Sequence, residues 1–219
     1  MTGSSPPQDH RHRRPGTVRG VTLIELMVTL VLLAVLLLAV MPSIGAWLRN
    51  GEIRTAAQGM VNALQKARAE AVRRNQDVWF SLVSHSTASS GVLDNSCALS
   101  GASASWVISL SSPEGACAQP VSETTAPQIL DKHARGDGSP HAVVTVRGAD
   151  CSGTDSASQV VFSSFGRATA PSGASVLRCL DVSHSVEGDQ RPLRVLIGTA
   201  GNVRLCDPAV SDATDPRHC

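Results

Sequence analysis

The sequence predicts an α+β fold, in which one long N-terminal helix packs on an antiparallel β-sheet. Three observations lead to this prediction. An apolar run extends from Val21 to Val40, a helical spacing of apolar residues continues to about Asn75, and short β-rich runs separated by turn residues follow. Roughly 140 residues remain after the helix, which is enough for one domain and not for two. A helix followed by consecutive strands is typical of α+β architecture.

Residues 1–20 form a basic leader rich in Pro, Ser and Gly. It holds four arginines against one acidic residue, Asp9: Arg11, Arg13, Arg14 and Arg19. Positive charge before a membrane helix keeps that end cytoplasmic, so we expect the C-terminal part to face the periplasm. Without the leader the chain holds 15 Lys and Arg and 17 Asp and Glu. It therefore has no overall basic field that would attract nucleic acid or anionic lipid.

Residues 21–41 are predicted to be the membrane-spanning half of the helix. About 20 residues at 1.5 Å each cover the ~30 Å hydrocarbon core of a bilayer. Glu25 is the single charge in the run from Val21 to Val40. A carboxylate at the membrane centre costs roughly 2.5–3.5 kcal/mol, and somewhat less near a helix end. Its presence so close to the start of the run calls for a functional reason.

Residues 42–76 are predicted to be the amphipathic half of the same helix. Pro42 marks the change, at a place where a helix can kink. One apolar stripe then follows three- and four-residue steps, which suits packing on a sheet: Ile53, Ala56, Met60, Leu64, Ala67 and Ala71. Lys66 and Glu70 lie four residues apart and are expected to pair, a contribution of a few tenths of a kcal/mol.

Residues 77–219 are predicted to form a β-rich globular domain. Its β-rich runs are Val78–Val83, Trp106–Leu110, Ala142–Val146, Gln159–Phe162, Val176–Leu180 and Leu193–Ile197. Clusters of Gly, Ser, Pro and Asp separate these runs. The segment from Ser84 to Pro140 matches no motif.

All six cysteines follow the apolar run, which suits disulfide bonds in an oxidising periplasm. Six cysteines allow 15 pairings, and the sequence does not choose among them. Local position favours Cys97 with Cys117, which flank a predicted strand, and Cys206 with Cys219, which would close the C-terminal tail. Cys151 with Cys179 then remains. A zinc site is the alternative, but no C-x-x-C or H-x-x-x-H spacing occurs.

Nothing in the sequence indicates an enzyme. There is no P-loop, G-x-G-x-x-G or G-x-S-x-G motif and no paired His–carboxylate spacing. The seven histidines are scattered over the leader, the loops and the tail: His10, His12, His85, His133, His141, His184 and His218. We expect no catalytic residue, no cofactor and no metal.

The segment GVTLIE at residues 20–25 resembles the processing site of type IV pilins and pseudopilins. The resemblance implies that a prepilin peptidase cleaves after Gly20 and that the new N-terminal residue, Val21, is methylated. It implies that Glu25 pairs with the N-terminal amine of a neighbouring subunit, so that an ammonium offsets its desolvation. It also implies a single-pass inner-membrane protein that joins a filament. Two alternatives are a signal peptide cut after Ala46 and a plain membrane anchor.

Three later segments resemble the GspH/FimT family of pilin-like proteins. LQKARAEAVRRN at residues 64–75 is similar to the family pattern L-Q-x-A-R-x-E-A-x-x-R-x. Phe162 with Phe165-Gly166-Arg167 resembles an F-x-x-x-G turn, and GNVRLC at residues 201–206 resembles the closing strand. The family includes minor pilins of the type IV pilus and pseudopilins of the type II secretion system. The helix motif and the R-L-C strand favour the pilus.

Some pilins of this family bind DNA for natural transformation, so a DNA-receptor role is a further alternative. The family feature is a C-terminal G-R-x-R loop, in which this chain has Asn202 for the first Arg and keeps Arg204. Each lost cation forfeits one counterion-release contact with phosphate. Arg178, Arg191 and Arg194 could substitute on neighbouring strands. We favour the interpretation that they are solvated surface arginines, so DNA is a possible partner but not the preferred one.

Overall fold

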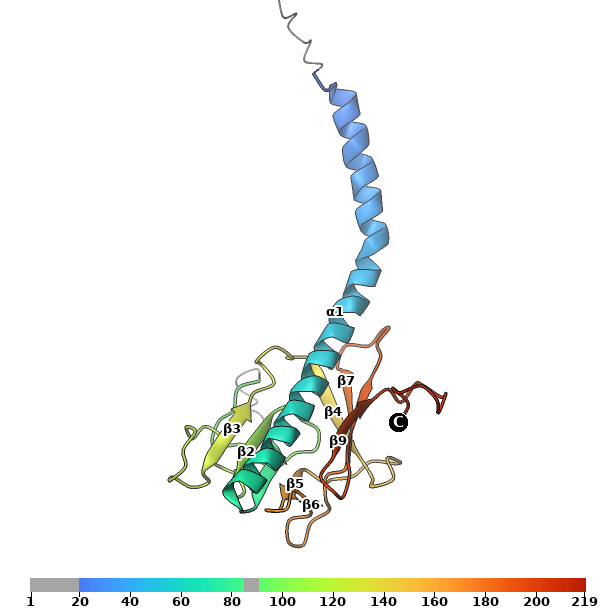
Figure 1. The fold of residues 1–219 in the computed structure, drawn as a ribbon. Coiled ribbons are helices and arrows are strands. Elements are labelled where there is room, and N and C mark those ends of the chain that lie inside the picture. The colour runs from blue at the N-terminus through green and yellow to red at the C-terminus, as the bar shows by residue number, and fades with distance from the viewer. Residues whose placement is uncertain (1–19, 85–90) are drawn as a thin grey trace, which may run out of the picture. The chain divides into compact units, whose positions relative to one another are not determined.

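The computed structural model describes residues 20–84 and 91–219, with the backbone alone at residues 39–42. The leader before Gly20 and most of the Ser84–Ser90 loop lie outside the described residues, and expectations about them stay predictions. The chain divides into two compact units, Met1–Pro42 and Ser43–Cys219, which are described separately (Figure 1).

One helix, α1, extends over Leu23–Arg74, 52 residues, close to the predicted range of 21 to about 75. In the first unit every described side chain from Val21 to Leu38 is exposed, and apart from Thr22, Glu25 and Thr29 these side chains are apolar. Among the described residues no single helix is long and apolar enough to cross a membrane. The segments Leu23–Leu38 and Ser43–Arg74 meet that test only as a pair.

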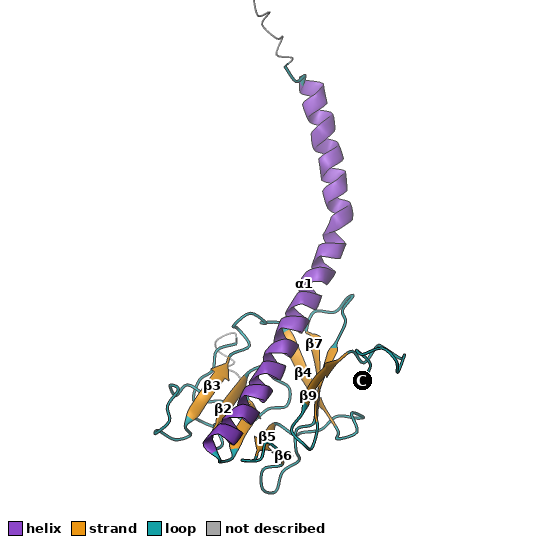
Figure 2. Cartoon of the chain, in the orientation of Figure 1, coloured by secondary structure: helices purple, strands orange, loops and turns teal. Residues whose placement is uncertain are grey.

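In the second unit, α1 buries the predicted apolar stripe. All six of its residues are at most 6% exposed, which confirms the prediction. Ala57, Val61 and Ala63 are buried as well, so the buried face is wider than one stripe. The reason is that this part of α1 packs against two sheets, as Figure 2 shows. Small alanine side chains let the helix backbone lie close to the strands.

The first sheet has five antiparallel strands in the order β3-β2-β1-β5-β6. Their bounds are β1 Val78–Leu82, β2 Trp106–Ser109, β3 Ile129–His133, β5 Gln159–Phe162 and β6 Ala168–Thr169. Phe80 of β1 stands opposite Ile108 on one side and Val160 on the other. All three are fully buried, and they form the central row of this sheet beneath α1.

The second sheet has four antiparallel strands in the order β4-β7-β8-β9. Their bounds are β4 Ala142–Arg147, β7 Cys179–His184, β8 Leu193–Ile197 and β9 Val203–Cys206. Burial alternates along β4, so one face of the sheet enters the core and the other faces outward. Leu180 pairs with Val195 on the core face, and Asp181 pairs with Arg194 on the outer face.

The main core lies where α1 meets both sheets, and a smaller apolar cluster lies apart from it. That satellite cluster consists of Val83, Cys97, Val107, Cys117 and Ile129. All of these residues except Val83 belong to the segment from Ser84 to Pro140 that matched no motif. This segment adds β2 and β3 to the first sheet and has an apolar centre of its own.

The α+β prediction is confirmed, and the structure refines it. The strands divide into two sheets instead of one. β7 covers Cys179–His184 instead of Val176–Leu180, and two strands, β3 and β6, were not expected. The expected Lys66–Glu70 pair is wrong. Lys66 instead pairs with Asp131 on β3 at 2.7 Å, a partner that sequence spacing cannot reveal.

Glu70 has different partners from the one predicted. Its carboxylate accepts hydrogen bonds from Arg73 at 2.6 Å and from Arg74 at 2.8 Å. Arg74 also pairs with Glu123 at 2.6 Å. The pKa of Glu70 is lowered, mainly by the hydrogen bond from Arg73. Burial raises this pKa, but the hydrogen bond from Arg74 adds to the lowering, which prevails. The end of α1 is thereby tied to the Ser84–Pro140 segment.

Candidate functional site

The predicted processing and assembly residues lie at the start of α1. Among the described residues a Cβ atom on Gly20 would meet nothing within 4 Å, and the Gly20–Val21 bond precedes the start of α1 at Leu23. Thr22 caps the helix: its Oγ1 accepts the backbone N–H of Glu25 at 3.3 Å, and its carbonyl oxygen accepts that of Leu26 at 3.1 Å. Glu25 is thus in the first turn, where the helix dipole favours a carboxylate. Its side chain has no ion-pair partner among the described residues.

The three later motifs meet at Arg68 of α1. Its Nε donates to the carbonyl oxygen of Gly166 at 3.1 Å, and its Nη2 donates to that of Ala200 at 3.2 Å. Gly166 is in the β5–β6 turn and Gly201 in the β8–β9 turn, with φ of +72° and +78°. A Cβ on Gly201 would overlap the carbonyl oxygen of Gly166. The helix motif, the F-x-x-x-G turn and the closing strand therefore form one junction that joins α1 to both sheets.

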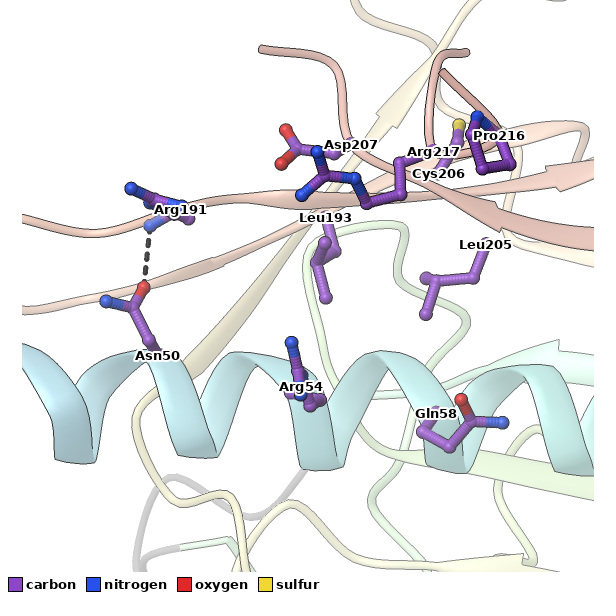
Figure 3. A pocket seen from close by; sticks show the side chains of 10 residues that line it. All are labelled: Asn50, Arg54, Gln58, Arg191, Leu193, Leu205, Cys206, Asp207, Pro216 and Arg217. Carbon is purple, nitrogen blue, oxygen red and sulfur yellow. Dashed lines mark hydrogen bonds between the residues drawn. The ribbon is translucent and has the colours of Figure 1, made fainter. Parts of the chain in front are cut away.

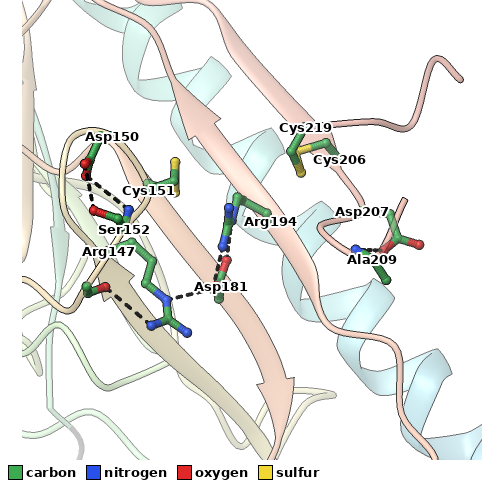
Figure 4. A network of polar contacts seen from close by, with 12 residues as sticks. Arg147, Asp150, Cys151, Ser152, Asp181, Arg194, Cys206, Asp207, Ala209 and Cys219 are labelled. Atoms are coloured by element: carbon green, nitrogen blue, oxygen red, sulfur yellow. Dashed lines mark hydrogen bonds and ion pairs between the residues drawn. A yellow bond between two sulfur atoms is a disulfide. The ribbon is translucent and has the colours of Figure 1, made fainter. Parts of the chain in front are cut away.

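A carboxylate at the centre of the second sheet's outer face binds two arginines (Figure 4). Asp181 accepts from Arg194 at 2.6 and 3.0 Å and from Arg147 at 2.8 Å. Burial of Asp181 disfavours its charged form, but the hydrogen bonds and positive charges of Arg194 and Arg147 outweigh burial and lower its pKa. Arg194 is therefore held by Asp181, which it shares with Arg147.

Two further DNA-binding candidates, Arg178 and Arg204, line one hollow of about 440 Å³ together with Asn202. Arg204 donates from Nη2 to the main-chain oxygen of Cys219 at 2.8 Å. Arg178 donates from Nη1 to the carbonyl oxygen of Ile197 at 3.4 Å. The structure thus brings Arg178 and Arg204 together and directs Arg194 elsewhere.

A groove of about 460 Å³ runs between α1 and the edge of the second sheet (Figure 3). We call it the α1–β9 groove. Its lining residues are Asn50, Arg54, Gln58, Arg191, Leu193, Leu205, Cys206, Asp207, Pro216 and Arg217. Leu193 and Leu205 project from the sheet towards the helix, and Arg54 projects from the helix towards the sheet. Three cations and one carboxylate therefore line a cleft with apolar walls.

The three disulfides are Cys97–Cys117 and Cys206–Cys219, which the sequence favoured on local grounds, and Cys151–Cys179, the pair that then remained. The first lies in the satellite cluster, the second on the outer face of the second sheet, and the third closes the tail beside β9. Each closes a local loop, with sequence separations of 20, 28 and 13 residues.

Lys132 of β3 holds the loop that follows Cys117. Its Nζ donates to three carbonyl oxygens, those of Cys117 at 3.0 Å, Ala118 at 3.2 Å and Gln119 at 2.8 Å. An ammonium has three donors, so this arrangement uses all of them. The side chain replaces the backbone partners that an irregular loop lacks.

His184 and Glu52 join β7 to α1. The His184 Nε2 lies 3.2 Å from the Glu52 carboxylate, while its Nδ1 accepts the backbone N–H of Val186 at 3.0 Å. Because Nδ1 is an acceptor, the proton is on Nε2 and points to Glu52. No group of three or more His, Cys, Asp or Glu within the described ranges is arranged to hold a metal ion.

Two family models match this chain. The model described as type II transport protein GspH matches residues 56–201, more than half of the sequence. The prokaryotic N-terminal methylation motif matches residues 17–41. This chain belongs to the GspH/FimT family.

Solved structures similar to this GspH/FimT chain include the type IV minor pilin FimU of Pseudomonas aeruginosa strain PAO1 in two crystal forms. One is 16% identical, with 74% of this chain and 94% of that chain covered and a TM-score of 0.44. The other is also 16% identical, with 73% and 97% covered and a TM-score of 0.42. A comparison with curated proteins found no match.

Family membership identifies the protein as a minor pilin or pseudopilin, a structural subunit with a membrane anchor and a periplasmic domain. In this GspH/FimT chain the family motifs carry a structural role that the sequence did not indicate. Neither Arg68 nor Gly201 was predicted to meet the other, because they lie far apart in sequence. A cation inside a helix motif and glycines in two turns are a signal that could have suggested such a junction.

Two further features could not be found from sequence. Arg54 lay simply off the apolar stripe, and Arg217 lay in an irregular tail, so nothing placed them in one groove. Lys132 stood in a segment without a motif. Arg54 and Arg217 line one groove because α1 packs beside the second sheet, and Lys132 bonds to carbonyl oxygens of a separate loop.

Proposed function

We propose that this GspH/FimT chain is a minor subunit of a type IV pilus, assembled through its N-terminal helix. One observation carries the proposal: a methylation motif at residues 17–41 precedes a GspH match at residues 56–201 in the same chain. The proposed organisation is a cleaved leader at 1–20, a membrane-spanning half-helix at 21–41, an amphipathic half-helix at 42–76 and a periplasmic domain at 77–219. Before assembly the protein is a single-pass inner-membrane protein.

Processing is proposed to occur between Gly20 and Val21, with prepilin peptidase as the partner and methylation of Val21 as the next step. The position of the Gly20–Val21 bond before the first turn of α1, which begins at Leu23, supports this assignment. We expect the purified mature protein to begin at Val21 by mass spectrometry, and a Gly20→Leu variant to keep its leader. A mature N-terminus at Trp47 would instead establish cleavage by a signal peptidase.

Glu25 is proposed to bind the N-terminal amine of a neighbouring subunit. The position at N3 of α1 offsets part of the cost of a carboxylate in an apolar segment, but it supplies no countercharge. A partner that exists only in the filament supplies one. We therefore expect Glu25→Ala to insert in the membrane as well as the wild type and to be missing from sheared filaments.

That experiment compares the membrane fraction with the sheared filament fraction by immunoblot. Thr29→Ala is a matched control on the same helix, because Thr29 only donates to the carbonyl oxygen of Leu26. Normal recovery of Glu25→Ala in filaments would contradict the proposed assembly role.

The alternative is a pseudopilin of the type II secretion system. The helix motif at residues 64–75 and the strand at residues 201–206 support the pilus side. Deletion of the gene is expected to reduce surface pili and to leave export of folded exoproteins unchanged. Stalled export with normal pili would favour the secretion role.

A further inference from the structure

We infer that the α1–β9 groove is a docking site for an acidic segment of another filament subunit. The inference rests on the proposed filament role and adds a partner chemistry to it. It combines three observations: unpaired arginines, apolar walls and a groove that is held open by bonds within the chain.

The arginines leave the groove with uncompensated positive charge. The guanidinium groups of Arg54 and Arg191 have no ion-pair or hydrogen-bond partner among residues 20–84 and 91–219, and both residues are exposed. Arg217 is bound by Asp215 at 2.6 Å. Asp207 is the one acidic residue among the described residues that line the groove. A carboxylate that entered between Arg54 and Arg191 would find the planar donors that form bidentate pairs.

The apolar walls of the groove favour a peptide as the ligand over the phosphate backbone of a nucleic acid. Leu193 and Leu205 are partly buried and face the helix across the groove. An acidic side chain flanked by an apolar one would satisfy both the arginines and the leucines. A nucleic-acid phosphate has no apolar group for these walls, and a duplex binds to cations that project from a surface. Gln58 adds an amide at the rim.

The groove exists before any partner binds. The Asn50 Oδ1 accepts the backbone N–H of Arg191 at 2.7 Å, which fixes the helix against the start of β8. The backbone N–H of Asp207 donates to the carbonyl oxygen of Arg217 at 2.8 Å, and the Cys206–Cys219 disulfide closes the tail. Because these walls are already ordered, docking costs little conformational entropy.

The test is site-specific photo-cross-linking of the full chain in piliated cells. Gln58 is replaced by p-benzoyl-phenylalanine, and the cross-linked peptides are identified by mass spectrometry. We expect an acidic peptide of another pilin. The double variant Arg54→Glu with Arg191→Glu is expected to lower the cross-link yield at least about tenfold, since two charge-assisted contacts are replaced by repulsion. Arg167→Glu is the matched control, because Arg167 is an exposed arginine in the β5–β6 turn, outside the groove.

A charge exchange completes the test. Changing the cross-linked acidic residue of the partner to Arg is expected to restore the yield in the double Glu variant. An unchanged yield in that variant, failure of the exchange, or cross-links to DNA alone would overturn the inference. These outcomes differ from failure of the proposed function, in which the wild-type protein itself would be missing from the filament fraction.

Discussion

Gly201 has a φ of +78° and lies against the carbonyl oxygen of Gly166, at the point where Arg68 binds both turns. We predict that Gly201→Ala destabilises the periplasmic domain by about 3 kcal/mol, from a left-handed conformation and an overlap that the turn must relieve. Urea unfolding of the full chain in detergent measures this change.

Gly173→Ala is the control for that prediction. Gly173 has a φ of +76°, but a Cβ there would meet nothing within 4 Å. It therefore carries the conformational cost of about 1–2 kcal/mol without the overlap. Equal destabilisation by the two variants would show that the close approach at Gly201 contributes nothing.

Asp181 is predicted to make stability depend on pH. Its pKa is lowered in the folded protein, so its contribution is fully present above the unfolded value of about 3.9 and is lost as pH falls through the lower folded value. Asp181→Asn is expected to cost about 2 kcal/mol at pH 7, because it removes charged hydrogen bonds to two arginines. In thermal unfolding the difference in Tm between wild type and variant is expected to become smaller below about pH 4.

An exposed pair serves as the comparison. Arg217 lowers the pKa of Asp215 to about 2 through a side-chain hydrogen bond, but water screens this pair. Asp215→Asn is expected to change stability less than Asp181→Asn. If the difference in stability between the wild type and Asp181→Asn did not change with pH, the ionisation of Asp181 would have no part in stability.

At the scale of elements, Lys132 is predicted to hold the loop after Cys117 and not the sheet. Lys132→Met keeps the aliphatic stem and removes three donors, which leaves carbonyl oxygens of a part-buried loop without partners. We expect faster hydrogen exchange in residues 113–122, by about one order of magnitude or more, and little change in β1 and β5.

Lys66→Met is the control for this variant. Lys66 forms an ion pair with Asp131 of β3, but its side chain is 48% exposed and bonds to that single carboxylate. Such pairs contribute about 0–1 kcal/mol. If both variants changed exchange equally, the three carbonyl bonds of Lys132 would have no special part in ordering the loop.

The elements differ in how far sequence could predict them. The helix and most strands were predictable because their apolar residues repeat with a clear period, as in the six-residue stripe of α1. β3 was missed because Asp131, Lys132 and His133 give it polar, half-buried positions. The end of β7 was missed for the same reason, since Asp181 is buried only with the help of Arg147 and Arg194.

The candidate sites were likewise predictable only where their residues are close in sequence. The N-terminal motif is contiguous, so Gly20, Val21 and Glu25 could be chosen from sequence, and their roles stay predictions. The α1–β9 groove combines residues from α1, β8, β9 and the tail, and no short-range pattern links Arg54 with Arg191 or Arg217. Arg194 looked available on its strand, and its partner Asp181 is revealed only by strand register.

At the scale of the whole molecule, we predict weak binding of duplex DNA with a shallow salt dependence. Arg178 and Arg204 share a hollow, whereas Arg194 is held in an ion pair by Asp181. Phosphate contacts from the two cations of this hollow alone give a slope of log affinity against log salt no steeper than about −2. Arg204→Ala is expected to weaken binding to all sequences alike, because a backbone contact reads no bases.

Fluorescence anisotropy of the full chain in detergent, over a range of salt concentrations, measures both quantities. Arg194→Ala is expected to have less effect on affinity than Arg204→Ala. A tight complex with a steep salt dependence at physiological ionic strength would contradict this prediction and would support the DNA-receptor alternative.

The wide buried face of α1 has a mechanical consequence. A pull applied along the helix axis loads this face in shear, so many side chains between Ile53 and Ala71 must slide out of both sheets together. A strand at a sheet edge, pulled sideways, separates one hydrogen bond at a time and resists less. A subunit held by such a helix can transmit tension from its anchor to its globular part without peeling a strand from either sheet.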